Sequence, residues 1–236
     1  MSPRLIEHAN LALLRRVAER LGELREQVVF LGGAATDLLI TDPAAGPVRA
    51  TVDVDVVIEV VSRSAYSRIQ QQLQRAGFVE DERPGAPLCR WVVDGIPVDV
   101  MPTDPSILGF ANRWYPAVVA APTRHTLREG PEIRLITGPL FVATKLEAFR
   151  QRGQSDLYGS RDLEDIVAVV DGRAELVMEC RAASSDVRSY LASALRKLME
   201  KSEFVDALSG HLAPDAGSQG RIPLVIERIE AITRLG

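Results

Sequence analysis

Residues 51–61 read TVDVDVVIEVV, a run in which β-branched side chains dominate. Such side chains favour extended backbone, so the run predicts a buried strand. Side chains two positions apart in a strand point the same way, which would place Asp53 and Asp55 on one face and the alternating valines on the other. Two carboxylates about 6 Å apart repel by about 3 kcal/mol at an effective dielectric of about 20. We therefore expect a cation to compensate this pair.

A glycine pair lies upstream of this strand. Residues 27–33 read QVVFLGG, which predicts a short buried strand that ends at Gly32 and Gly33, and a short helix is expected over residues 35–40. Glycines between a strand and a helix allow phosphate oxygens to approach the N–H groups at the helix N-terminus. Gly32 and Gly33 are therefore candidate nucleotide-binding residues, although a glycine pair is more often only a tight turn.

A third acid follows downstream, in a predicted hairpin. Residues 88–101 read LCRWVVDGIPVDVM, with Asp94-Gly95 as a two-residue turn between apolar runs. The second strand of this hairpin carries Asp99 and can pair beside residues 51–61. Asp53, Asp55 and Asp99 would then hold one or two magnesium ions, with manganese as the alternative, because these cations prefer carboxylate oxygens. The alternative interpretation is that the three aspartates only face water on a half-exposed sheet.

The rest of the chain predicts an α+β protein with two domains. The order of strand, helix, strand, helix and hairpin indicates a small mixed β-sheet with helices on one face, joined by two short strands near 124–127 and 133–136. After Gly138 the apolar pattern becomes helical. The helices expected there cover residues 139–152, 161–170, 184–201 and 221–235. We therefore predict an α/β domain over 1–138 and a helical domain over 139–236.

Composition limits the function classes. Apolar residues make up 46% and charged residues 25% of the 236 residues, which is typical of a globular protein. The net charge of −4 gives no overall attraction to nucleic acid or to an anionic membrane, so a polyanionic partner would need a local basic surface. Cys89 and Cys180 lack metal-ligand spacing and are expected to be packed thiols. No apolar run reaches the length of a membrane span, so we expect a soluble cytoplasmic protein with no membrane partner.

The motifs together resemble the nucleotidyltransferase superfamily that includes DNA polymerase beta. Its pattern is a strand, Gly-Gly or Gly-Ser, a short helix, an Asp-x-Asp strand and a third carboxylate on a later strand. Here it reads FLGGAATDLL, RATVDVDVVIEV and IPVDVM, within residues 28–101. Gly33 replaces the serine of many members, and the gap from Gly33 to Asp53 is longer than in the compact ones. The resemblance implies transfer of a nucleoside monophosphate from a nucleoside triphosphate to a hydroxyl acceptor, with Asp53, Asp55 and Asp99 as metal ligands.

The longer gap and the second half of the chain are similar to the abortive-infection AbiE-type toxin nucleotidyltransferases. The resemblance then extends from about residue 28 to 170. The residues that carry this narrower resemblance are Arg49, Thr51, Lys145, Arg161, Asp162 and Asp165. It implies that Lys145 contacts the nucleotide phosphates and that Asp162 and Asp165 orient Lys145 or contact the nucleotide. It also implies that the protein is a toxin that modifies RNA such as tRNA. A separate antitoxin protein would neutralise this toxin.

Each of these assignments has a structural alternative. Lys145 shares a helical face with Phe141 and Phe149, where a lysine can simply extend its ammonium group to water. Asp162 and Asp165 follow Ser160, a good N-cap, and acids in the first turn stabilise a helix in any case. The arginines at positions 150, 152 and 161 form either a rim for a polyphosphate or RNA backbone, or a solvated helix face.

Two functional alternatives remain. One is nucleotidyl transfer to a small molecule, such as an antibiotic or a metabolite, which the acidic net charge favours over a large RNA acceptor. The other is an inactive nucleotide-binding module that has kept the fold.

Overall fold

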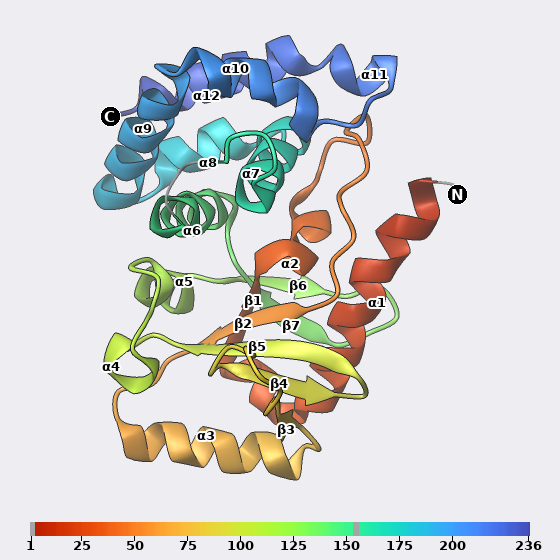
Figure 1. Ribbon diagram of the computed structural model, residues 1–236, viewed down its shortest axis with the longest axis vertical. Coiled ribbons are helices and arrows are strands. Elements are labelled where there is room, and N and C mark those ends of the chain that lie inside the picture. The colour runs from red at the N-terminus through yellow and green to blue at the C-terminus, as the bar shows by residue number, and fades with distance from the viewer. Residues whose placement is uncertain (1–2, 153–155) are drawn as a thin grey trace. The chain divides into compact units, whose positions relative to one another are not determined.

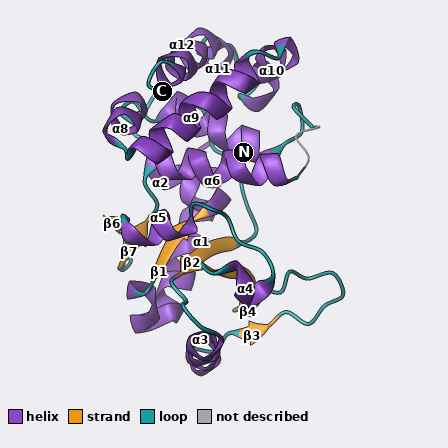
Figure 2. Ribbon diagram, turned by 90° about the vertical axis from the view of Figure 1, so that its left-hand side faces the viewer, coloured by secondary structure: helices purple, strands orange, loops and turns teal. Residues whose placement is uncertain are grey.

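The computed structural model of the protein describes residues 3–152 and 156–236 (Figure 1). The chain forms two compact units. The first unit comprises Met1–Asp37 and Arg49–Thr137, and the second comprises Leu38–Val48 and Gly138–Gly236. The strands of the described residues all belong to the first unit, and the second unit is helical there (Figure 2). The predicted α+β class, with a mixed sheet followed by helices, is confirmed.

The first unit is built on a seven-stranded mixed sheet. Its strands are β1 (Val28–Leu31), β2 (Val54–Ile58), β3 (Val79–Glu80), β4 (Arg90–Val93), β5 (Ile96–Pro102), β6 (Thr123–Thr126) and β7 (Glu132–Leu135). They lie in the order β3-β4-β5-β2-β1-β7-β6. The pairs β2–β5 and β1–β7 are parallel, and the other neighbouring pairs are antiparallel. The two short strands expected near 124–127 and 133–136 are therefore present as β6 and β7.

The helices of the first unit pack around this sheet. They are α1 (Pro3–Leu21), the 3-10 turn η1 (Gly22–Glu26), α2 (Gly32–Leu39), α3 (Arg63–Arg75), α4 (Pro105–Leu108) and α5 (Tyr115–Ala120). Helix α1 contacts β2 and β5, and α5 contacts β1 and β2. The prediction of a helix over 35–40 was wrong at its start, because α2 begins at Gly32, whose positive φ of 74° lets the chain turn directly out of β1.

Strand β2 is shorter than the run 51–61 that predicted it. It begins at Val54, so Asp53 precedes the strand, and Val52 is exposed instead of lying on the buried face with the later valines. The cause is the end of its neighbour: β1 stops at Leu31, which pairs with Asp55, so nothing on that side continues the ladder to Asp53. The predicted hairpin of β4 and β5 is confirmed, with Asp94 and Gly95 both at positive φ, as a two-residue turn of type I′ requires.

The second unit packs its helices on one another. They are α6 (Gly138–Gln151), α7 (Arg161–Gly172), α8 (Leu176–Ala182), α9 (Ser185–Met199), α10 (Ser202–Ala207), the 3-10 turn η2 (Leu208–His211), α11 (Ala216–Gln219) and α12 (Ile222–Thr233). The four predicted helices correspond to α6, α7, α9 and α12. The short elements between them were not predicted.

The second unit also contains Leu38–Val48, a segment that the predicted range 1–138 assigned to the first domain. Backbone N–H groups of Thr41 and Asp42 donate to the carbonyl of Gly172 at 2.9 and 2.8 Å. Arg173 donates to the carbonyl of Leu39 at 2.9 Å. The segment is thus hydrogen-bonded to the C-terminal end of α7, which is why it belongs with the helices.

Candidate functional site

Strand pairing brings two of the three predicted acids side by side. In the parallel pair β2–β5, Asp55 lies opposite Asp99. In the antiparallel pair β4–β5, Asp99 lies opposite Arg90. Residues opposite each other on neighbouring strands share one face of the sheet, so Arg90, Asp99 and Asp55 form a row across three strands. Like charges directly opposite each other are destabilising, so the Asp55–Asp99 pair needs positive charge nearby.

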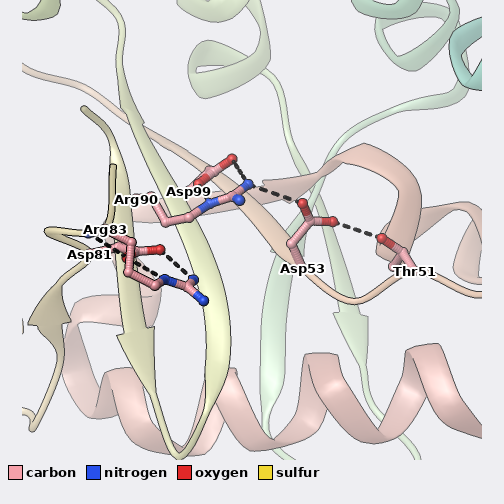
Figure 3. Close-up of polar contacts among 6 residues, drawn as sticks. All are labelled: Thr51, Asp53, Asp81, Arg83, Arg90 and Asp99. Atoms are coloured by element: carbon pink, nitrogen blue, oxygen red, sulfur yellow. Dashed lines mark hydrogen bonds and ion pairs between the residues drawn. The ribbon is translucent and has the colours of Figure 1, made fainter. Parts of the chain in front are cut away.

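Arg90 supplies that positive charge. Its Nε donates to Asp99 Oδ1 at 2.8 Å, and its Nη2 donates to Asp99 Oδ2 at 2.8 Å and to Asp53 Oδ2 at 3.2 Å (Figure 3). The pairing with Asp99 is a two-pronged charge-assisted hydrogen bond, the strongest kind that a carboxylate makes with a side chain. The Asp99 hydrogen bonds raise the pKa of Arg90 above its ordinary value. Asp53 and Asp99 therefore point toward one shared cation.

Asp53 is held from its other side by Thr51. The Thr51 hydroxyl donates to Asp53 Oδ1 at 2.7 Å (Figure 3). Both oxygens of Asp53 are thus fixed, one by Thr51 and one by Arg90, although the residue lies outside the strand.

Asp55 lies against the first residue of α2. A Cβ added to Gly32 would come within 1.8 Å of Asp55 Oδ2, so only glycine fits at this position. The positive end of a helix favours a carboxylate beside it. The structure therefore explains why position 32 is a glycine: the absence of a side chain leaves room for the carboxylate of Asp55.

Arg49 covers the second glycine. A Cβ added to Gly33 would lie 2.7 Å from Arg49 Nη2, so this guanidinium rests on the first turn of α2. Gly32 and Gly33 were predicted to admit phosphate oxygens, and here the side chains of Asp55 and Arg49 occupy the space beside them. Arg49 is consequently the group that presents positive charge at this helix end.

A buried asparagine fixes the segment between Arg49 and Asp53. Asn10 on α1 is fully buried, and its Nδ2 donates to Asp37 Oδ2 at 2.8 Å and to the carbonyl of Arg49 at 3.0 Å. Its Oδ1 accepts from the N–H of Thr51 at 3.0 Å. The Asn10 side chain thereby sets where Arg49 and Thr51 lie, and Thr51 in turn holds Asp53.

The sequence reasoning missed both Arg90 and Asn10. Arg90 could have been found from the hairpin: with Asp94-Gly95 as the turn, Val93 pairs with Ile96, and counting outward pairs Arg90 with Asp99. No comparable pattern identifies Asn10, whose partners lie between 27 and 41 residues further along the chain.

Asp53, Asp55 and Asp99 are the residues predicted to hold a divalent cation. Three carboxylates are the ligands that magnesium and manganese prefer, and the guanidinium of Arg90 marks a point toward which Asp53 and Asp99 both turn. Among residues 3–152 and 156–236, no group of three acidic, histidine or cysteine side chains has the arrangement of a metal site. Arg90 lies between Asp53 and Asp99, and Asp55 Oδ2 lies against Gly32.

Both cysteines are buried free thiols. Burial raises the pKa of the Cys89 thiol to about 12, and the nearby Asp99 and Asp55 carboxylates add to the effect. Burial likewise raises the pKa of Cys180 to about 12. Both thiols stay protonated and packed, as predicted.

The other predicted site residues form a cluster inside the second unit. Lys145 on α6 places its Nζ 2.6 Å from Asp165 Oδ2 and 3.5 Å from Asp162 Oδ1, both on α7. Arg152 also pairs with Asp162. Asp162 and Asp165 thus hold Lys145, in agreement with the prediction that they orient it. Contact of the three residues with a nucleotide stays a prediction. Ser160 caps α7 by accepting from the N–H of Leu163, as expected.

The predicted arginine rim is partly paired within the unit. Arg150 donates to both oxygens of the buried Glu147, and Arg152 is bound to Asp162. Arg150 therefore neutralises an acid of its own helix and Arg152 an acid of α7, which favours the structural interpretation for both.

No protein-family model and no curated protein matches this chain. Within the part of the chain that the structure describes, none of the helices combines the length and the apolarity that crossing a membrane requires.

Proposed function

We propose that this protein is a metal-dependent nucleotidyltransferase, which moves a nucleoside monophosphate from a nucleoside triphosphate to a hydroxyl acceptor and releases pyrophosphate. The observation that carries the proposal is the placement of three aspartates on adjacent segments of the sheet, two of which bind the same guanidinium. Asp55 is in register with Asp99, and Asp53 and Asp99 share one cation. A folded protein gains nothing from concentrating these negative charges unless a cation is used there.

Asp53, Asp55 and Asp99 would hold the magnesium or manganese ions of this reaction. When bound, such ions neutralise the charge that develops on the phosphates. Arg49, which lies against Gly33 at the start of α2, would bind phosphate oxygens. Asp99 would also take up the proton of the attacking hydroxyl. Thr51 keeps Asp53 oriented through its 2.7 Å hydrogen bond. Most of the rate enhancement would then come from positioning and charge stabilisation.

Incubation of the purified protein with magnesium, each of the four labelled triphosphates and bulk RNA tests the proposal. Label transferred by the wild type is expected to fall at least about 100-fold in Asp53→Asn/Asp55→Asn, because the lost charges stabilise the transition state. Asp81→Asn is the matched control: the Asp81 side chain pairs with Arg83, and the substitution keeps the backbone hydrogen bond from Asp81 to the carbonyl of Arg90. Normal transfer by the double variant would show that the metal assignment is wrong.

The same experiment identifies the class of acceptor. The resemblance implies RNA such as tRNA, and a toxin role with an antitoxin partner, whereas the net charge of −4 favours a small-molecule acceptor. Label that sediments with RNA supports the first class. Label confined to small molecules supports the second.

One observation favours the alternative of an inactive nucleotide-binding module: Arg90 lies where a metal ion would contact Asp53 and Asp99. This alternative predicts that calorimetry detects triphosphate binding while no acceptor is labelled under any condition. Turnover with any acceptor excludes it.

A further inference from the structure

We propose that Arg90 is a built-in counter-cation of the Asp53–Asp55–Asp99 cluster, and that a divalent cation binds by displacing its guanidinium from the carboxylates. This inference rests on the metal site of the proposed function and adds to it a residue that controls cation affinity. Arg90 is then a positioning residue, because it affects cation binding through the carboxylates that it contacts.

The guanidinium of Arg90 occupies the space between the carboxylates of Asp53 and Asp99. Its Nη2 lies 2.8 Å from Asp99 Oδ2 and 3.2 Å from Asp53 Oδ2, so one nitrogen bridges two carboxylates of the cluster. A metal ion with these two acids as ligands would have to sit where that nitrogen lies. Two cations cannot share the position, so binding of one requires that the other leaves.

Arg90 cannot give up its positive charge by losing a proton. A guanidinium stays charged at any pH at which the protein is folded. Movement of the side chain is therefore the only way to vacate the position. That movement is open to it, because 22% of the Arg90 side chain is exposed and β4 has only the two-residue β3 beyond it at the edge of the sheet.

Arg90 also offsets the repulsion among the acids of the cluster. Asp55 on β2 and Asp99 on β5 are cross-strand neighbours, and Asp53 lies just before β2. Without positive charge these acids would repel and the β2–β5 pairing would weaken. Arg90 thus stabilises the acids for folding and at the same time weakens cation binding, because the binding free energy must exceed that of its hydrogen bonds.

The test measures manganese affinity of the whole protein by calorimetry, and thermal midpoints in EDTA and in manganese. Arg90→Gln removes the competing cation. We expect it to melt lower than the wild type in EDTA, to bind manganese at least about tenfold more tightly, and to show the larger manganese-induced rise in midpoint. Arg90→Lys keeps the charge but lacks the two-pronged geometry, so its affinity should fall between those two.

Arg83→Gln is the matched control. It removes the same charge from the loop between β3 and β4, where the Arg83 side chain pairs with Asp81 and has no hydrogen bond to Asp53 or Asp99 in Figure 3. Its manganese affinity should stay within about twofold of the wild type, because exposed charges at a distance are largely screened.

The outcomes separate this inference from the proposed function. Manganese affinity in Arg90→Gln that is equal to or weaker than in the wild type overturns the role of Arg90, while the metal site stands. No manganese binding by either protein overturns both. If Arg90→Gln fails to fold, Arg90→Lys decides by the same criterion. Asp55→Asn should remove binding in the wild-type and Arg90→Lys backgrounds alike, which identifies the site being measured.

Discussion

At Gly32 the carboxylate of Asp55 lies so close to the backbone that a single methyl group has no room. Gly32→Ala would put its Cβ 1.8 Å from Asp55 Oδ2 and would also force alanine to a φ of 74°. We expect the substitution to lower the free energy of unfolding by about 2 kcal/mol or more, because strain and steric overlap add. Urea denaturation measures the change.

Gly33→Ala is the control for this prediction. Its Cβ would meet the guanidinium of Arg49, at the end of a flexible side chain, and its backbone needs no positive φ. The expected loss of stability is therefore under about 1 kcal/mol. Equal losses in the two variants would mean that the contact between Gly32 and Asp55 does not constrain the fold.

Single residues differ in how far the sequence could predict them. Asp55 and Asp99 could be placed together from the β-branched run and the two-residue turn, since both signals are local. A strand was expected to orient Asp53, but this residue precedes β2, and Thr51 and Arg90 hold its carboxylate instead. Asn10 could not be predicted at all, because its three hydrogen bonds form only after α1 has packed beside residues distant in the chain.

The helices α6 and α7 are joined by a buried ion pair that bears on the predicted role of Lys145. The Asp165 side chain is fully buried and that of Asp162 is 5% exposed. Lys145→Met would leave the buried Asp165 carboxylate without the Lys145 ammonium group. We expect a loss of about 3–5 kcal/mol in the free energy of unfolding, measured by chemical denaturation. Lys197→Met, on the exposed face of α9, should change it by less than about 0.5 kcal/mol.

A double variant separates the structural from the functional role of Lys145. Lys145→Met/Asp165→Asn removes both charges and should recover much of the lost stability. Recovery of stability without nucleotide transfer would support the phosphate contact that the family resemblance implies. Recovery of both would show that the pair serves only to join α6 to α7. An unchanged stability in Lys145→Met would contradict the burial argument itself.

Among the elements, the long or strongly patterned ones could be predicted and the short ones could not. The hairpin of β4 and β5 follows from Asp94-Gly95, and α9 from apolar spacing over several turns. Helices α10 and α11 have six and four residues, too few for a helical period to emerge from the sequence. Strand β2 was predicted too long because the apolar pattern continues beyond the point where its neighbour β1 ends.

At the scale of the whole molecule, the division into units does not follow chain order. Residues 38–48 leave the first unit through α2 and join the helices of the second. Composition could not reveal this, since the segment reads as an ordinary proline-containing loop. Its membership is decided by partners more than 120 residues away: Thr41 Oγ1 donates to Glu175 Oε2, and Arg221 Nη2 donates to Asp42 Oδ2, both at 2.7 Å.

This exchange predicts how the chain behaves when it is divided after Thr137. Fragment 138–236 alone lacks the segment that receives the side chains of Arg173 and Arg221. It should therefore unfold at a lower urea concentration than the second unit does in the intact protein, because buried or half-buried arginines lose charge-assisted hydrogen bonds.

Co-expression with fragment 1–137 should restore this stability, because that fragment carries residues 38–48. The two fragments are expected to co-purify, and Thr41→Ala/Asp42→Ala in fragment 1–137 should weaken the association. Thr123→Ala, on the edge strand β6, is the control and should leave the association unchanged. If fragment 138–236 alone matched the intact chain in its urea midpoint, residues 38–48 would be dispensable. The second unit would then be an independent helical domain whose stability owes nothing to the loop after α2.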